Sequence, residues 1–146
     1  TGSASLGVFA TDAYTGTNLV ADSQPAAGLN IIGFFFDSVV TLGDPGSAAA
    51  GVLKCISGGG SGAVTVHKNL GATAADTFYN LAINYKQGVA RLFVDGREQV
   101  SIRDSAAAFP TGKLRPILIG KAMPADNADA VDVTFNTELI AAGQLD

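Results

Sequence analysis

The single cysteine and the single histidine are the residues of this 146-residue chain best suited to nucleophilic chemistry. Cys55 and His67 flank the glycine-rich stretch SGGGSG (57–62), which could fold them onto paired strands. A thiol beside an imidazole can act as nucleophile and general base. The alternative is a thiol in the core and an imidazole at the rim of the fold, and this alternative is the one we expect.

Hydrolysis of glycosides and binding of phosphate need other patterns. A retaining glycosidase uses two carboxylates about 5–5.5 Å apart, but the only glutamates, Glu98 and Glu138, fall in separate predicted elements. The SGGGSG stretch lacks the Lys-Ser/Thr pair and the helix that follow a phosphate-binding loop. We therefore expect no enzyme activity and no catalytic residue, and we interpret SGGGSG as a hairpin loop.

Two weaker binding sites can be read from the chain. The stretch ADNADAVD (125–132) contains oxygen ligands that suit calcium, although such clusters also form turns; they are Asp126, Asn127, Asp129 and Asp132. Sugar recognition commonly uses exposed aromatic rings, and the chain has no Trp and three Tyr. Tyr14, in a predicted turn, is the best stacking candidate. We assign no metal or cofactor.

Composition restricts the class of protein. The chain suits a single domain, residues 1–146, and is 47% apolar and only 15% charged, which leaves a surface rich in small neutral residues that is compatible with packing against other proteins. Its net charge is −4 and its nine Lys and Arg are scattered singly, which argues against nucleic acid as a partner.

The longest apolar run, IIGFFF, is far shorter than the ~20 residues of a membrane span. One lone cysteine allows no internal disulfide, so folding in a reducing compartment is plausible.

Turn residues recur along the chain between segments that favour β structure. The expected strands are 5–10, 17–22, 29–40, 51–56, 63–68, 77–85, 89–94, 97–102, 114–120 and 130–136. The apolar run 29–40 is typical of a strand buried on both faces, or of a strand that crosses the core of a sandwich. Asp95-Gly96 suits a type I′ turn between paired strands. Residues 137–144 could form at most a short helix, so we predict an all-β protein built from two antiparallel sheets.

Apolar residues at every second position support the strands predicted in the central part of the chain. Leu81 and Ile83 share one face of their strand, and Leu92 and Val94 share one face of the next. We expect these four side chains to be largely buried. Residues 79–102 should form adjacent strands.

The segment DTFYNLAINYKQGVARLFVDGREQVSI (76–102) resembles the central part of laminin-G-like, concanavalin-like jelly rolls. Phe78 occupies the family's aromatic position, 81–83 its apolar strand, Tyr85 the terminal aromatic and 92–96 the hairpin; ILIG at 117–120 and the segment 131–145 resemble the strands and short helix that follow. The resemblance covers about residues 75–144. It implies a two-sheet antiparallel jelly-roll sandwich, and many such domains bind calcium in rim loops.

These features lead to two hypotheses of function. The first is a non-catalytic structural module, most simply a virion protein that decorates (cements) a phage capsid and is assembled in the host cytoplasm. It would bind a larger protein shell and itself, as a homodimer or higher assembly. Because Asp12, Asp22 and Asp37 are the only side chains of residues 1–40 that are charged at pH 7, we expect the segments 5–10 and 17–22 to lie at or near a sheet edge and to make these contacts. The alternative is an extracellular carbohydrate-binding adhesion module of a secreted or surface protein, with sugar or calcium in its rim loops.

Overall fold

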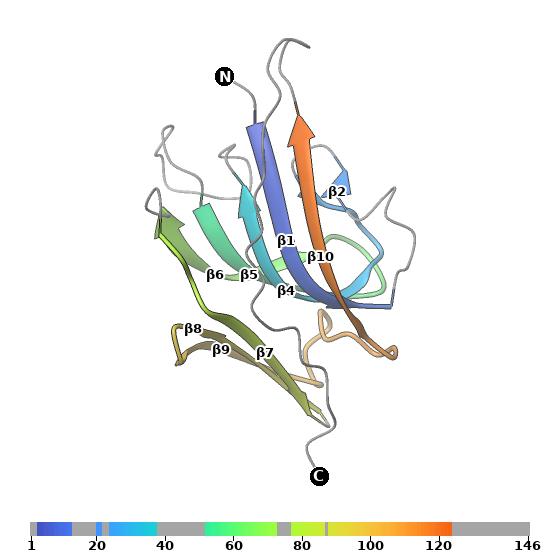
Figure 1. Ribbon diagram of the computed structural model, residues 1–146. Helices are drawn as coiled ribbons and strands as arrows, with labels where there is room; N and C mark the ends of the chain where they lie inside the picture. The colour runs from blue at the N-terminus through green and yellow to red at the C-terminus, as the bar shows by residue number, and fades with distance from the viewer. Residues whose placement is uncertain are drawn as a thin grey trace.

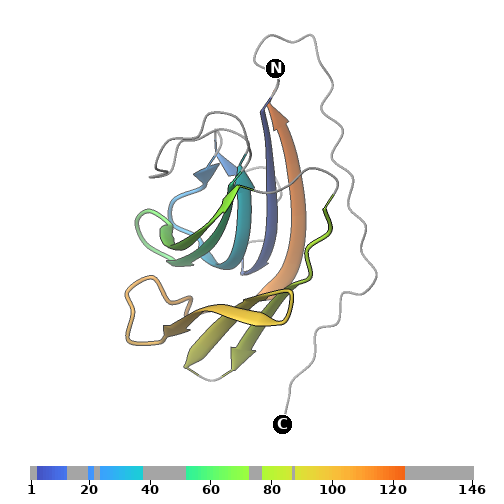
Figure 2. The ribbon, with the colours of Figure 1, turned by 90° about the vertical axis from the view of Figure 1, so that its left-hand side faces the viewer.

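The structure is a computed structural model that describes residues 3–12, 20–21, 24–37, 52–72, 77–86 and 88–123, and within these ranges every regular element is a strand. As far as the chain is described, the larger sheet has five strands in the order β10-β1-β4-β5-β6 and the smaller has three in the order β7-β8-β9. All their neighbours are antiparallel. The two sheets lie one above the other as separate layers (Figures 1 and 2), so the chain forms the all-β, two-sheet arrangement of a β-sandwich.

The strands have the following bounds: β1 Ser3–Thr11, β4 Asn30–Asp37, β5 Val52–Gly59, β6 Thr65–Ala72, β7 Leu81–Lys86, β8 Val89–Val94, β9 Arg97–Arg103 and β10 Arg115–Met123. Two short strands, β2 (Val20–Ala21) and β3 (Gln24–Pro25), pair with each other, and they have no other strand partner among the described residues. The helix expected over 137–144 and the strand expected over 130–136 lie outside the described residues. No helix in the described ranges has the length and apolar character needed to cross a membrane.

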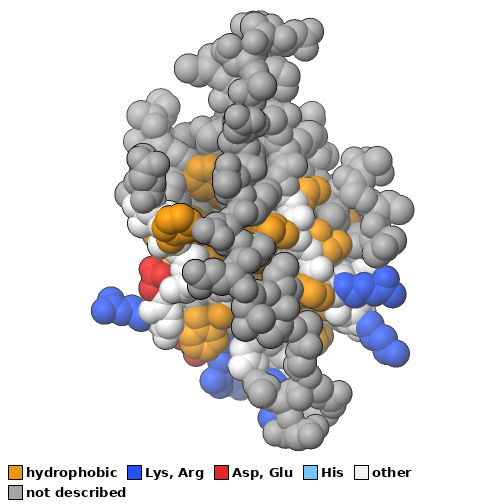
Figure 3. All heavy atoms as spheres, viewed as in Figure 1, with side chains coloured by type: hydrophobic (Ala, Val, Ile, Leu, Met, Phe, Trp, Pro, Cys, Tyr) orange, Lys and Arg blue, Asp and Glu red, His pale blue; other side chains and the backbone are white. Residues whose placement is uncertain are grey.

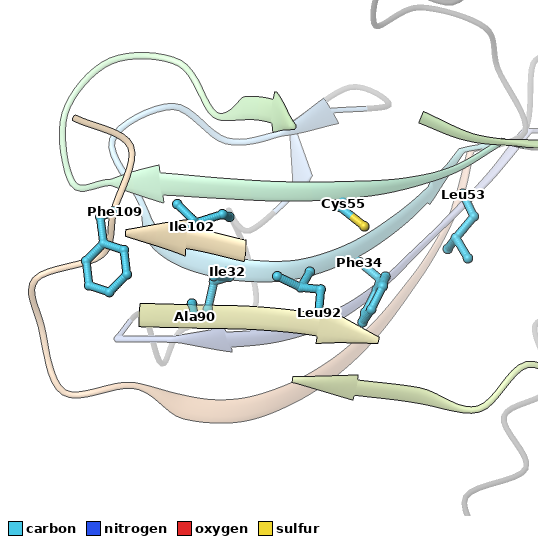
Figure 4. Packing of buried hydrophobic residues seen from close by; sticks show 8 residues of the cluster. All are labelled: Ile32, Phe34, Leu53, Cys55, Ala90, Leu92, Ile102 and Phe109. Carbon is cyan, nitrogen blue, oxygen red and sulfur yellow. The ribbon is translucent and has the colours of Figure 1, made fainter. Parts of the chain in front are cut away.

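The core lies between the two sheets. Alternate residues of β4, Ile32 and Phe34, point toward the smaller sheet, where Leu92 of β8 meets them (Figure 4). The same buried cluster also contains Leu53, Cys55, Ala90, Ile102 and Phe109. This close packing of side chains from both layers holds the sheets together, because apolar area removed from water stabilises by about 25 cal/mol per Å².

The opposite face of the five-stranded sheet is also buried. Ile31 and Phe35 of β4 pack there with Phe9 of β1 and Ile56 of β5. The rings of Phe9 and Phe35 are stacked, with centroids 6.4 Å apart. Since β4 contributes side chains to both clusters, the first of the two interpretations of the apolar run is confirmed: the strand is buried on both faces.

The β8–β9 hairpin has the predicted turn. Both turn residues have positive φ angles, 50° at Asp95 and 75° at Gly96, as a type I′ turn requires. The expected burial was only partly right. Leu92 is fully buried, but Leu81, Ile83 and Val94 are half-buried. The reason is that β7 is an outer strand of the smaller sheet as described, and Val94 lies at the end of β8.

Segment 5–10 was expected at or near a sheet edge, and it lies one strand in from the edge of the larger sheet. These residues belong to β1, which is paired with β10 on one side and with β4 on the other. Because both sides of β1 are paired, the strand itself offers no free backbone edge for the expected contacts. Of segment 17–22, only Val20 and Ala21 are described, as β2.

Candidate functional site

The residues that could take part in nucleophilic chemistry lie at an irregularity in the pairing of β5 with β6. Cys55 lies opposite Lys68, whereas the next residue, Ile56, lies opposite Val66. His67 is therefore the extra residue of a β-bulge. A bulge changes the direction of the side chains that follow it, so it decides which groups His67 can reach.

The imidazole of His67 contacts a hydroxyl and not the predicted thiol. Its Nε2 lies 2.7 Å from Oγ of Ser57. The prediction that Cys55 and His67 lie on paired strands is confirmed, but the bulge places His67 beside the residue two positions further along β5. The sequence analysis did not identify Ser57 as the partner of His67. A signal was present, because Ser57 begins the SGGGSG loop and the predicted strand AVTVHK, which contains His67, follows that loop.

A serine beside a histidine is one part of the arrangement used by serine hydrolases. Here the Ser57 side chain is fully buried, so a substrate carbonyl could not approach Oγ without opening the β5–β6 pair. Burial also lowers the pKa of His67, which keeps the ring neutral near pH 7. The geometry thus suits a structural hydrogen bond that fixes the bulge to β5.

The thiol of Cys55 is equally enclosed. It points into the core between the sheets (Figure 4) and is fully buried. Burial raises its pKa to about 11, and the nearby positive charge of Lys68 offsets only part of this rise. Because the thiolate is the reactive species, Cys55 is inert at neutral pH, as the sequence-based interpretation of a core thiol predicted.

Lys68 connects the bulge to the second sheet. Its Nζ donates a hydrogen bond of 2.9 Å to Oε1 of Gln99. Gln99 is itself the extra residue of a bulge, since Leu92 lies opposite Val100 while Phe93 lies opposite Glu98. The two bulged strands, β6 and β9, therefore meet along one side of the sandwich through a polar contact.

The remaining predicted residues do not join this cluster. Glu98 lies on the outer surface of β9, with its carboxylate 3.9 Å from Nε of Arg91. Glu138, the calcium candidates Asp126, Asn127, Asp129 and Asp132, and the stacking candidate Tyr14 all lie outside the described residues. Within the described part of the chain, no three His, Cys, Asp or Glu side chains form a group suited to a metal ion.

Two surface features were not predicted. Phe78, just before β7, is 81% exposed, which is unusual for a large apolar side chain. The second feature is a shallow depression of about 300 Å³ on the outward side of β7 and β8. It is lined by Asn84, Lys86, Val89 and Arg91. In the space-filling view, Lys and Arg side chains project at separate points around the lower half of the molecule (Figure 3).

Comparison with known proteins adds no relative. No family model matches the chain, and neither a curated protein nor a solved structure is significantly similar to it.

Proposed function

We propose that this chain is a non-catalytic binding module of jelly-roll type that decorates a larger protein shell, in the manner of a phage capsid cement protein, and that it associates with itself. The proposal combines the two-sheet architecture with the half-chain resemblance to laminin-G-like domains. It rests on surface contacts, because the groups that could perform nucleophilic chemistry are used inside the sandwich.

The observation that carries the proposal is the exposure of Phe78. A free aromatic ring is costly to leave in water, and aromatic side chains are frequent anchors of protein interfaces. Tyr85, on the neighbouring strand β7, is 41% exposed. The weakly charged surface, with 15% charged residues in the chain, favours contact with another protein because few ions must be desolvated.

Cosedimentation with purified shells tests the proposal directly. Empty capsids assembled from a candidate major coat protein are mixed with the purified chain and pelleted. We expect saturable binding, with Phe78→Ser weakening it and Thr77→Ser, which keeps the exposed ring, leaving it unchanged. A chain that stays in the supernatant at all concentrations would contradict the proposal.

The alternative, a glycan-binding module, is favoured by the same ring, because exposed aromatics also stack on sugar faces. Phe78 replaces Tyr14 as the stacking candidate among the described residues. An immobilised glycan array, probed with and without calcium, separates the two functions. Retention on a glycan together with no binding to shells would favour the alternative.

A further inference from the structure

The outer strands of the two sheets differ in how well they are protected against pairing. β6 contains two register irregularities, and β9 contains one together with the charges of Arg97, Glu98 and Arg103. β10 begins with Arg115-Pro116, and proline cannot donate a ladder hydrogen bond. Bulges, charges and prolines are the devices by which proteins block edge strands.

β7 has none of these devices along its length. Its six residues, LAINYK, pair with β8 in continuous register and contain no proline. The single charged residue is Lys86, at the end of the strand. Among the strands described, β7 is therefore the outer strand best suited to accept another strand.

The direction of its backbone groups follows from one hydrogen bond. The N–H of Asp95 donates to the carbonyl of Asn80 at 2.9 Å, so the backbone of residue 80 faces β8. Since successive residues of a strand point their N–H and C=O groups to opposite sides, those of Leu81, Ile83 and Tyr85 face away from β8.

We propose that β7 pairs with β7 of a second copy of this chain, antiparallel and across a two-fold axis at Ile83. This inference deepens the self-association proposed above by naming its surface. In this register Leu81 lies opposite the partner's Tyr85, and Ala82 lies opposite the partner's Asn84. The three-stranded sheets of the two copies then join into one continuous sheet.

Charge complementarity favours a second copy in this register. Lys86 comes to lie opposite the partner's Asn80, whose backbone N–H is bound at 2.9 Å by the Asp95 carboxylate of the same subunit. Each lysine thus approaches an aspartate of the other subunit, and the two-fold axis makes this contact twice. No like charges face each other along the strand.

A charge exchange on the exposed positions of β7 tests the pairing. Ala82 and Asn84 are both exposed on the outer surface, and the register places them opposite each other in the two copies. Ala82→Lys with Asn84→Lys introduces facing lysines, and Ala82→Glu with Asn84→Glu introduces facing glutamates. The control, Ser101→Lys with Ser105→Lys, adds the same charge at exposed positions away from β7.

Sedimentation velocity over a concentration series measures the dimer. We expect the dissociation constant to rise at least about tenfold, equivalent to about 1.4 kcal/mol, in the lysine and the glutamate variants and to stay unchanged in the control. An equimolar mixture of the lysine and glutamate variants should dimerise about as well as the unmodified chain. This recovery depends on the register, and a general loss of stability would not produce it.

The outcomes separate this inference from the proposed function. A chain that binds shells but is monomeric at all concentrations, or a dimer unaffected by the β7 variants, overturns the β7 pairing and leaves shell binding standing. A β7-dependent dimer that binds no shell supports the pairing and contradicts the shell proposal. A monomer whose β7 is covered by another part of its own chain would also refute the pairing.

Discussion

Adding one methyl group at Gly33 should destabilise the fold strongly. Gly33 lies in β4 opposite Phe9 of β1. A Cβ built there would overlap the carbonyl oxygen of Val8 and lie 2.9 Å from Cα of Phe9. Both are backbone atoms of a neighbouring strand, so no side-chain rotation can relieve the contact. β1 would have to move, and β1 is also paired with β10 on its other side.

The magnitude follows from two contributions. Overpacking of a well-packed interior costs about 1–3 kcal/mol, and each ladder hydrogen bond weakened by separating β1 from β4 costs about 1 kcal/mol. We therefore expect Gly33→Ala to lower the free energy of unfolding by about 3 kcal/mol. The matched control is Gly62→Ala, because Gly62 has a φ of 73° and nothing within 4 Å of its Cβ position. There the left-handed conformation alone costs about 1 kcal/mol.

Urea unfolding followed by far-ultraviolet circular dichroism measures both changes. With an m value of about 1.5–2 kcal/mol/M for a chain of this size, a loss of about 3 kcal/mol moves the midpoint down by about 1.5–2 M. The control should move it by about 0.5 M. If the midpoint of Gly33→Ala falls no further than that of Gly62→Ala, the close approach of β1 and β4 at this position is refuted.

Three further outcomes are expected. Gly96→Val places a β-branched residue at a φ of 75° and should cost about 1–3 kcal/mol; an unchanged melting temperature would contradict the assigned turn. Burial lowers the pKa of His67 in the folded state, so the unfolded chain binds its proton first. Stability should fall as pH drops below about 6.5, the ordinary pKa, and His67→Gln should flatten this dependence in urea titrations at pH 7.5 and pH 5. Because the pKa of Cys55 is raised to about 11, a disulfide reagent at pH 8 should label the thiol only after unfolding, and rapid labelling of the native protein would show that it is accessible.

Part of the candidate site could be predicted from the sequence. The glycine-rich loop indicates that Cys55 and His67 lie on paired strands, and they do. The partner of His67 could not be predicted, because alternation places side chains on a face only while the register is continuous. The extra residue in β6 breaks that continuity and brings His67 to Ser57.

The sequence alone determined the local elements. The Asp95-Gly96 pair specifies its turn, and the apolar run around Phe34 specifies a strand buried on both faces, because backbone preference and the two-residue period act over a few positions. The order of strands within a sheet depends on contacts between distant segments. Only the tertiary structure therefore decided that the weakly charged β1 is paired on both sides and that β7 is an outer strand among the described residues. The side chains of a strand would satisfy the local pattern at an outer or at an inner position of the sheet. The free energy of burying them against particular neighbouring strands selects the position.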